Sequence, residues 1–275
     1  MFNNKLFSMN YRRGNTLCVL QLWGSACFQH IESYQRRSLA PVHYAPRSPD
    51  VSRADDQYLS KEKSMGIMSK LGQQWRKPTG SLGRLLLSAM NINHSKLTDW
   101  ALSHISIGRH DTILDVGCGG GATVQKLARI ASEGKVCGID LSEESVKVSN
   151  RRNKQLIKTD RVEIRHGTVS SLPFSDAMFD LVTAVNTHNY WPNLVADMRE
   201  VLRVLKPGGK LMIVGGGYKG GKNANRNEKF AKLVNIPLHS VNELSKLFSM
   251  AGYADVQIFE EHDRGWICGT GTKPL

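Results

Sequence analysis

The chain has 275 residues, enough for one α/β domain with a sizeable core plus extensions. Its 40% hydrophobic and 22% charged residues are ordinary for a soluble globular protein, and no apolar run approaches the roughly 20 residues of a membrane span. The net charge is +13, but the basic residues are scattered and no aromatic-basic motif accompanies them, which argues against a nucleic-acid partner. The five cysteines include no Cys-x-x-Cys pair and no histidine at zinc spacing, so we expect free thiols, a reducing compartment and no metal site.

Residues 1–60 are predicted to be an extension outside the fold. Up to Pro49, six basic residues stand against the single acid Glu32, with serines and apolar residues between them, as in organelle transit peptides. A targeting segment would send the protein to a mitochondrion or another organelle. A disordered tail, or an upstream extension of a chain that starts at Met65 or Met68, would leave it in the cytoplasm.

Residues 61–107 are predicted to form a helical cap ahead of the main domain, residues 108–275. Apolar side chains recur at helical spacing around Leu86 and again around Trp100. A polar, turn-prone segment lies between residues 77 and 84, and Arg84 in it is a candidate substrate contact, although Gly and Pro mark ordinary turns as well.

Residues 112–122 are the most informative stretch. A short apolar run at 112–116 predicts a buried strand, residues 117–121 contain four glycines, and helical spacing begins at Ala122. Glycines at such a strand-to-helix corner let the backbone and a ligand approach closely.

Two ligands fit this corner. Gly117, Gly119 and Ala122 match a dinucleotide fingerprint, whereas Gly117, Gly119 and Gly121 match the Gly-x-Gly-x-Gly of S-adenosylmethionine sites. Asp115 favours the second ligand, because a carboxylate repels a pyrophosphate but attracts an ammonium and a sulfonium group. Asp140 follows the next predicted strand, 23 positions after Gly117, where it can accept hydrogen bonds from a ribose. Both cofactors carry that ribose, so Asp140 does not choose between them.

The alternation of strands and helices continues to the end of the chain. We expect a helix over 142–157, strands at 162–165 and 179–185, a helix over 192–205 stopped by Lys-Pro-Gly-Gly, and a strand at 210–214. A mobile loop at 219–227, a helix over 240–250 and antiparallel strands at 256–259 and 266–269 follow. The pattern predicts an α/β fold with a doubly wound, mostly parallel seven-stranded sheet and ligands at the carboxyl ends of its strands.

Four motifs stand in register along this domain. They are residues 114–121 (Leu-Asp-Val-Gly-Cys-Gly-Gly-Gly), 138–140 (Gly-Ile-Asp), 172–174 (Leu-Pro-Phe) followed by Phe179-Asp180, and 200–209 (Glu-Val-Leu-Arg-Val-Leu-Lys-Pro-Gly-Gly). Their order and spacing resemble those of class I S-adenosylmethionine-dependent methyltransferases with a Rossmann-like, methyltransferase type 11-like domain. The resemblance covers residues 75–272 and is strongest to the small-molecule branch that contains the ubiquinone and menaquinone biosynthesis enzymes.

The resemblance implies a set of cofactor-binding residues. The methionine end of S-adenosylmethionine would lie at the glycine turn, the ribose at Asp140 and the adenine between Leu141 and the pair Thr168 and Val169. The full implied set is Asp115, Gly117, Cys118, Gly119, Gly121, Asp140, Leu141, Thr168, Val169 and Asn186. Related enzymes often carry an acid where Thr168 stands, and the quinone enzymes carry Glu-x-Ser-x-Pro where this chain has Gly-Gly-Gly-Tyr-Lys after the fifth strand, so quinone methylation is not implied.

Residues 186–191, Asn-Thr-His-Asn-Tyr-Trp, are the predicted acceptor side. Tyr190 and Trp191 would wall an apolar or aromatic substrate, although such aromatics equally often pack against the next helix. His188 is a candidate general base, although a lone histidine at a strand end is more often structural. The segment is not the Asn/Asp-Pro-Pro-Tyr/Phe signature of enzymes that methylate planar amino groups.

We therefore expect an enzyme, monomeric or homodimeric, that transfers a methyl group from S-adenosylmethionine to a small molecule. Two alternatives stay open. One is a nicotinamide-dependent oxidoreductase, which the match at Gly117, Gly119 and Ala122 supports. The other is a non-catalytic methyltransferase-like module that binds RNA or serves assembly, which the positive charge permits.

Overall fold

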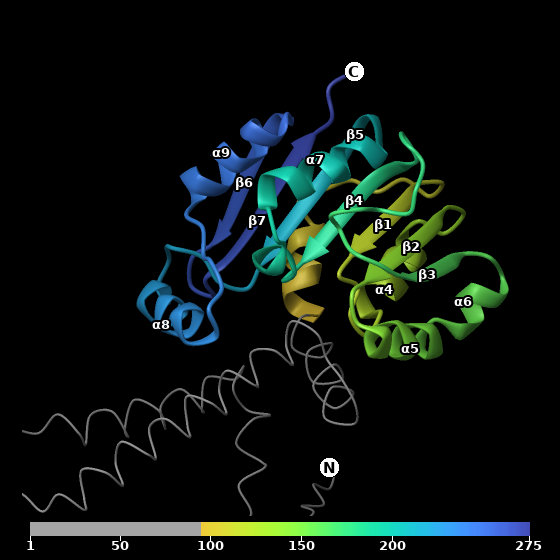
Figure 1. Ribbon diagram of the computed structural model, residues 1–275, viewed down its shortest axis with the longest axis horizontal. Coiled ribbons are helices and arrows are strands. Elements are labelled where there is room, and N and C mark those ends of the chain that lie inside the picture. Colours follow the sequence, from red (N-terminus) through yellow and green to blue (C-terminus); the bar gives the residue numbers. More distant parts are fainter. Residues whose placement is uncertain (1–94) are drawn as a thin grey trace, which may run out of the picture. The chain divides into compact units, whose positions relative to one another are not determined.

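A computed structural model describes residues 95–275, and Figure 1 shows their arrangement. These residues form one sheet of seven strands in the order β3-β2-β1-β4-β5-β7-β6. Neighbours from β3 to β5 run parallel, and β7 pairs antiparallel with both β5 and β6. The predicted doubly wound, mostly parallel sheet is thus confirmed. The strands are β1 Thr112–Val116, β2 Lys135–Asp140, β3 Val162–His166, β4 Phe179–Val185, β5 Leu205–Gly215, β6 Ala254–Glu261 and β7 Trp266–Thr272.

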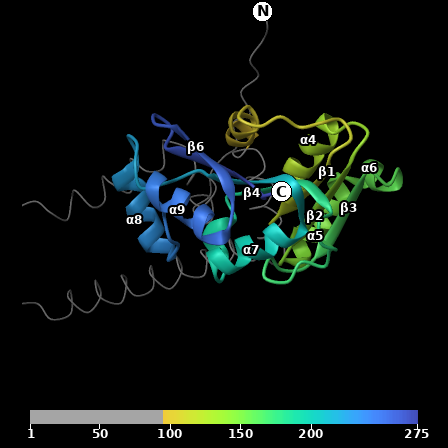
Figure 2. The same ribbon diagram turned by 90° about the horizontal axis from the view of Figure 1, so that it is seen from above.

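Helices cover both faces of the sheet. The helix at residues 95–102 and α4 pack on one face, where Ile113, Val136 and Met212 point, whereas α7 and α9 pack on the other, where Leu114 and Ile139 point (Figure 2). Alternate residues of one strand thus reach opposite cores, which explains why the central strands are apolar throughout. The helical bounds are α4 Ala122–Ile130, α5 Glu143–Arg152, α6 Lys154–Lys158, η2 His188–Tyr190, α7 Leu194–Val204, α8 Ala224–Val234 and α9 Val241–Ala251.

Local hydrogen bonds set where several helices begin. The Ser142 hydroxyl accepts from the Ser145 amide at the start of α5, and Ser240 with Glu243 forms a capping box at the start of α9. The helix predicted over 142–157 is two helices, because Asn153 separates α5 from α6. The buried Asn153 amide donates to the carbonyls of Gly121 and Ser149, so it joins α5 to the glycine turn.

Two predicted boundaries are wrong. The loop expected at 219–227 gives way to α8 at Ala224, since asparagines that favour turns in isolation are here part of a helix packed on the domain. The helix expected to reach Leu205 ends at Val204, and β5 already begins at Leu205. Gly208 and Gly209 belong to this strand because they pair with the carbonyl and amide of Lys273.

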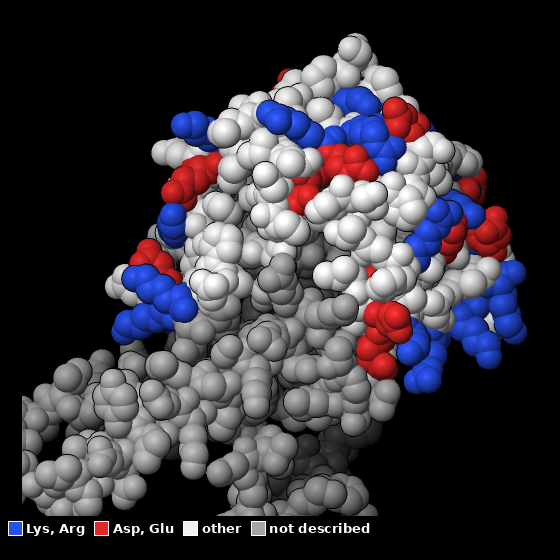
Figure 3. Space-filling model, in the orientation of Figure 1, with Lys and Arg blue, Asp and Glu red and all other residues white. Residues whose placement is uncertain are grey.

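Several predictions fall outside the described residues. These are the extension at 1–60, the cap up to residue 94, and Arg84. Within the described part of the cap, Leu97 and Ala101 are buried against the core that includes α4. Across residues 95–275 the structure contains no helix with the length and apolar character that a membrane crossing requires. In Figure 3 several groups of basic side chains lie next to acidic ones. The ion pairs of the domain include Lys219 with Glu243 and Arg203 with Asp176.

Candidate functional site

A cleft of about 500 Å³ opens at the carboxyl ends of β1, β2 and β4. This volume suits a small molecule or cofactor. It is lined by most residues of the predicted cofactor set and by Thr187, Tyr190 and Trp191 of the predicted acceptor side. The position agrees with the rule that open α/β sheets bind ligands beyond the carboxyl ends of their strands.

The glycine turn between β1 and α4 forms one wall of this cleft. Gly117, Gly119 and Gly121 all have positive φ, at +71°, +52° and +75°. The amides of Gly117 and Cys118 donate to the Ile139 carbonyl at 2.8 and 3.0 Å, so the turn is tied to the end of β2. A side chain at Gly117 would collide with Thr187, which adds a steric reason to the conformational one.

Asp140 is held by the backbone on two sides. One carboxylate oxygen accepts from the Gly119 amide at 2.8 Å and the other from the Ser142 amide at 2.8 Å. Burial raises the pKa of Asp140, and these two hydrogen bonds oppose that rise. Each oxygen keeps a lone pair, so the carboxylate is oriented and can still accept from ligand hydroxyls.

Asp115 lies deeper in the same cleft. Its side chain is 2% exposed, and it accepts a hydrogen bond of 2.7 Å from the Thr183 hydroxyl on β4. Burial raises its pKa to about 7, and the negative charge of Asp140 adds to the rise. A cation bound in the cleft would therefore stabilise the ionised form of Asp115, which burial disfavours.

The opposite wall carries apolar surface. Leu141 lines the cleft and is 43% exposed, an unusual position for a leucine in a core-forming region. Val169 and Thr168 line the cleft from the loop that follows β3. These residues offer a purine-sized ring an apolar contact together with a hydroxyl.

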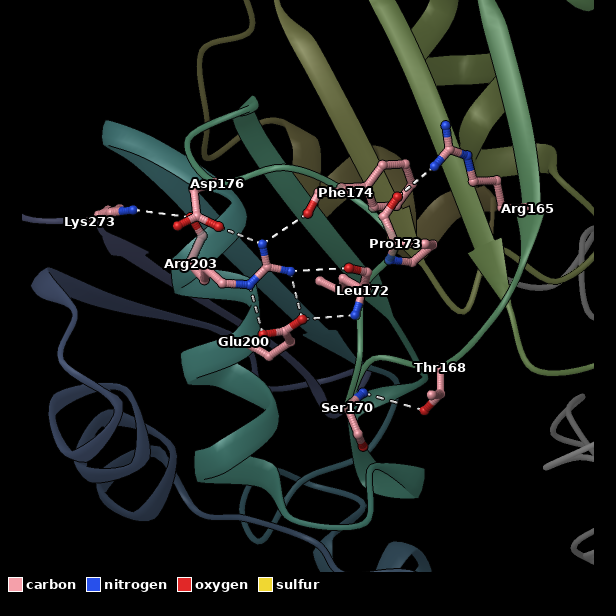
Figure 4. Close-up of polar contacts among 10 residues, drawn as sticks. All are labelled: Arg165, Thr168, Ser170, Leu172, Pro173, Phe174, Asp176, Glu200, Arg203 and Lys273. Atoms are coloured by element: carbon pink, nitrogen blue, oxygen red, sulfur yellow. Dashed lines mark hydrogen bonds and ion pairs between the residues drawn. The ribbon is translucent and has the colours of Figure 1, made fainter.

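The loop that carries Thr168 and Val169 is fastened by Arg203 and Glu200 of α7 (Figure 4). The Arg203 guanidinium donates to the carbonyls of Leu172 and Phe174 at 3.1 and 2.9 Å, and Glu200 accepts from the Leu172 amide at 2.8 Å. The sequence motif at 200–209 contains both residues, but only the folded chain reveals that they hold this loop.

The acceptor side is built by the turn after β4. Asn186 has φ +54°, and its Oδ1 accepts from the Gly216 amide at the end of β5 at 2.6 Å. Thr187, Tyr190 and Trp191 follow it along the wall of the cleft. Four of the six residues of the polar-aromatic cluster expected here thus line the cleft, and the other two, His188 and Asn189, do not.

His188, the candidate general base, is one of the two residues that do not line the cleft. Its side chain is 4% exposed, its ring lies 6.3 Å from the ring of His239, and it sits beside Gly215. Burial lowers its pKa to about 3. The imidazole is therefore neutral at physiological pH and turned away from the cofactor cleft.

Gly121 is another predicted site residue that does not line the cleft. Gly121 packs against Ser149 and Asn153, and Arg84 lies outside the described residues. Residues without a recognisable sequence signal line its outer part, among them Ser95, Lys126, Arg129 and Arg152.

Among residues 95–275, no group of three or more His, Cys, Asp or Glu side chains could hold an ion. Cys118, Cys137 and Cys268 are buried free thiols, and burial raises the pKa of each.

Comparison with known proteins agrees with this site. Residues 114–213 match the family described as a methyltransferase domain. An uncharacterised methyltransferase of Bacillus subtilis, YdaC, is 26% identical over 187 residues, which cover 67% of this chain and 96% of that protein. A demethylmenaquinone methyltransferase of Symbiobacterium thermophilum is 37% identical over 113 residues, but the match covers only 41% of this chain and 44% of that enzyme.

Solved structures show the same fold. A geranyl diphosphate methyltransferase bound to GPP and sinefungin superposes with a TM-score of 0.56 at 19% identity, covering 65% of this chain and 78% of that one. The sheet order, the glycine turn and the family match together define a Rossmann-like class I methyltransferase. The chain thus contains a methyltransferase domain of the S-adenosylmethionine-dependent kind, and small-molecule methyltransferases are among the proteins it resembles. These matches favour methyl transfer over the oxidoreductase and the RNA-binding module.

Proposed function

We propose that the cleft binds S-adenosylmethionine along the ends of β1 and β2 and a small-molecule acceptor against residues 186–191. The observation that carries this proposal is the pair of carboxylates in one cleft, Asp115 beside the glycine turn and Asp140 tied to that turn. Asp115 would face the positive charges of the ligand, and Asp140 would accept from its ribose hydroxyls.

The remaining surfaces fit the other parts of the cofactor. The exposed Leu141 suits the adenine ring, and Thr168 and Val169 flank the same position. Helix α4 begins at Ala122, its N-cap residue Gly121 provides no side-chain hydrogen bond, and its first turn contains no acidic residue. Its free backbone N–H groups therefore suit the methionyl carboxylate.

The described residues of the acceptor wall would position the acceptor. S-adenosylmethionine, when bound, supplies a methyl group that its sulfonium already activates. Among the described residues of the acceptor wall, Asn186, Thr187, Tyr190 and Trp191, no histidine or carboxylate is present to act as a base. The wall would align the acceptor with the methyl carbon and exclude water. We expect acceptors that ionise easily, or that are already nucleophilic.

Replacing Asp140 tests the cofactor assignment. Asp140→Asn keeps the size of the side chain but removes its negative charge. It also replaces one of the two oxygens that accept from backbone amides and, in this proposal, from the ribose. We expect calorimetry to show affinity for S-adenosylmethionine and S-adenosylhomocysteine at least about tenfold weaker, the loss of one charged hydrogen-bond set.

Asp160→Asn is the matched control. Asp160 lies in an exposed turn, where its φ of +53° suits asparagine, and it pairs only with Lys135. Equal affinity in the Asp140 variant and the wild type would refute the ribose assignment. Methyl transfer itself is tested with trideuteromethyl-labelled S-adenosylmethionine and the small-molecule fraction of a cell extract. Label found only in RNA or protein would contradict a small-molecule acceptor.

A further inference from the structure

Two N–H donors of the acceptor wall have no partner within residues 95–275. They are Asn186 Nδ2 and Trp191 Nε1, and both atoms are buried although their residues line the cleft. A buried donor left without an acceptor is destabilising, so most buried polar groups of native proteins have a partner. A ligand that presents an oxygen to both would remove that cost.

The Asn186 carboxamide has only its N–H donors left to offer a ligand. Its Oδ1 already accepts from the Gly216 amide at 2.6 Å, and an N–H group can face only the oxygen of the carboxamide. The left-handed backbone of Asn186, φ +54°, places the residue where the β4 turn meets the end of β5. Asparagine adopts this conformation more readily than most residues, so the donor is fixed in place before any ligand arrives.

This polarity bears on the chemistry of the acceptor. An amine that is recognised through its own N–H groups needs an acceptor atom, and Asn186 offers none because its oxygen is already engaged. An oxygen of a carbonyl, carboxylate or phenolate group matches both orphan donors. The methionyl carboxylate of the cofactor has the same chemistry, but the uncapped start of α4 already offers it backbone N–H groups.

We infer that Asn186 and Trp191 hold an oxygen of the methyl acceptor, so that the substrate is a carbonyl, carboxylate or phenolate compound and not a simple amine. The inference rests on the proposed function, because it assumes that the cofactor occupies the rest of the cleft. It makes both residues determinants of acceptor specificity.

Two conservative variants isolate the donors. Asn186→Asp keeps the oxygen that Gly216 requires and the tolerance for positive φ, but it replaces the donor by an acceptor. Trp191→Phe removes one N–H and keeps an aromatic ring against the core. Asn193→Asp is the control, since it adds the same charge nearby and still caps α7, but it does not line the cleft.

The probes are benzoate, acetophenone and aniline, added to the protein saturated with S-adenosylhomocysteine and followed by saturation-transfer NMR. We expect benzoate and acetophenone to bind the wild type and Asn193→Asp alike. Their affinity should fall at least about tenfold in Asn186→Asp and about threefold in Trp191→Phe, whereas aniline should not lose affinity in either. Acetophenone matters because it is neutral, so its loss cannot come from charge repulsion.

Calorimetry with S-adenosylhomocysteine and 5′-methylthioadenosine separates the two sources of oxygen. If the variants weaken S-adenosylhomocysteine but not 5′-methylthioadenosine, which lacks the amino-acid part, the donors serve the cofactor carboxylate and the inference is overturned. It is also overturned if no probe distinguishes Asn186→Asp from the wild type. If the wild type binds no S-adenosylhomocysteine, the proposed function itself fails, which is a separate and recognisable result.

Discussion

At the scale of single residues, Asp115 should make cofactor binding depend on pH. Burial raises its pKa to about 7, so the unliganded protein holds a proton there at pH 6 and has largely lost it at pH 8. A cationic ligand binds the ionised form, and affinity should therefore rise by up to about tenfold from pH 6 to pH 8 and level off above. Calorimetry with S-adenosylhomocysteine at pH 6, 7 and 8 measures this.

The controls for Asp115 use both a variant and a ligand. Asp115→Asn cannot ionise and should lose the pH dependence, and 5′-methylthioadenosine, which lacks the ammonium group, should show little of it in the wild type.

The proton on Asp115 also affects the stability of the fold. A native pKa above that of the unfolded chain means that stability contributed by this site falls as pH rises from about 4 to about 7. A flat affinity profile for S-adenosylhomocysteine would mean that Asp115 does not face the charge of the ligand.

At the scale of elements, α7 holds the loop that leads from β3 to β4. Arg203 donates to two loop carbonyls and to Asp176, and Glu200 accepts from a loop amide (Figure 4). Arg203→Met should lower the free energy of unfolding by about 1–2 kcal/mol, since charged hydrogen bonds of a part-exposed group are lost. It should also weaken adenosine binding, because Thr168 and Val169 belong to this loop and line the cleft.

Urea unfolding and calorimetry with adenosine check the two effects of Arg203→Met. Arg199→Met is a suitable comparison, because Arg199 lies on the same helix and donates only to the Met250 carbonyl outside the cleft. Equal effects from both variants on adenosine binding would show that the hydrogen bonds of Arg203 to the loop do not position Thr168 and Val169 for the adenine.

At the scale of the whole molecule, ligand binding should stabilise the full chain. A ligand at a hundredfold excess over its dissociation constant adds about 2.7 kcal/mol to the free energy of unfolding. For a domain of this size, that corresponds to a rise of about 5–10 °C in the thermal midpoint. We expect this shift with S-adenosylhomocysteine and none with NADH. A shift of similar size with NADH would revive the dinucleotide alternative that the glycine spacing also permits.

Local sequence patterns determined the framework of this protein. The apolar run at 112–116, the glycines after it and Asp140 predicted a strand, a turn and a ligand-binding edge. The structure forms the strand and the turn and places Asp115, Gly117, Gly119, Gly120 and Asp140 in one cleft. They could be predicted because periodicity, left-handed turns and the start of a helix depend on residues close together in the chain.

Contacts between distant segments decided the rest. His188 and Tyr190 are neighbours in the sequence, yet only Tyr190 reaches the cleft, because the turn after β4 packs His188 against Gly215 and His239. The hydrogen bond from Gly216 occupies the Asn186 oxygen and leaves only the N–H donors of that side chain for a ligand. The pKa of Asp115 is raised because folding buries it beside Thr183. Sequence alone specified which polar groups were available, whereas burial and hydrogen bonding across the sheet decided which of them face a ligand and in which protonation state, because both depend on neighbours that folding brings together.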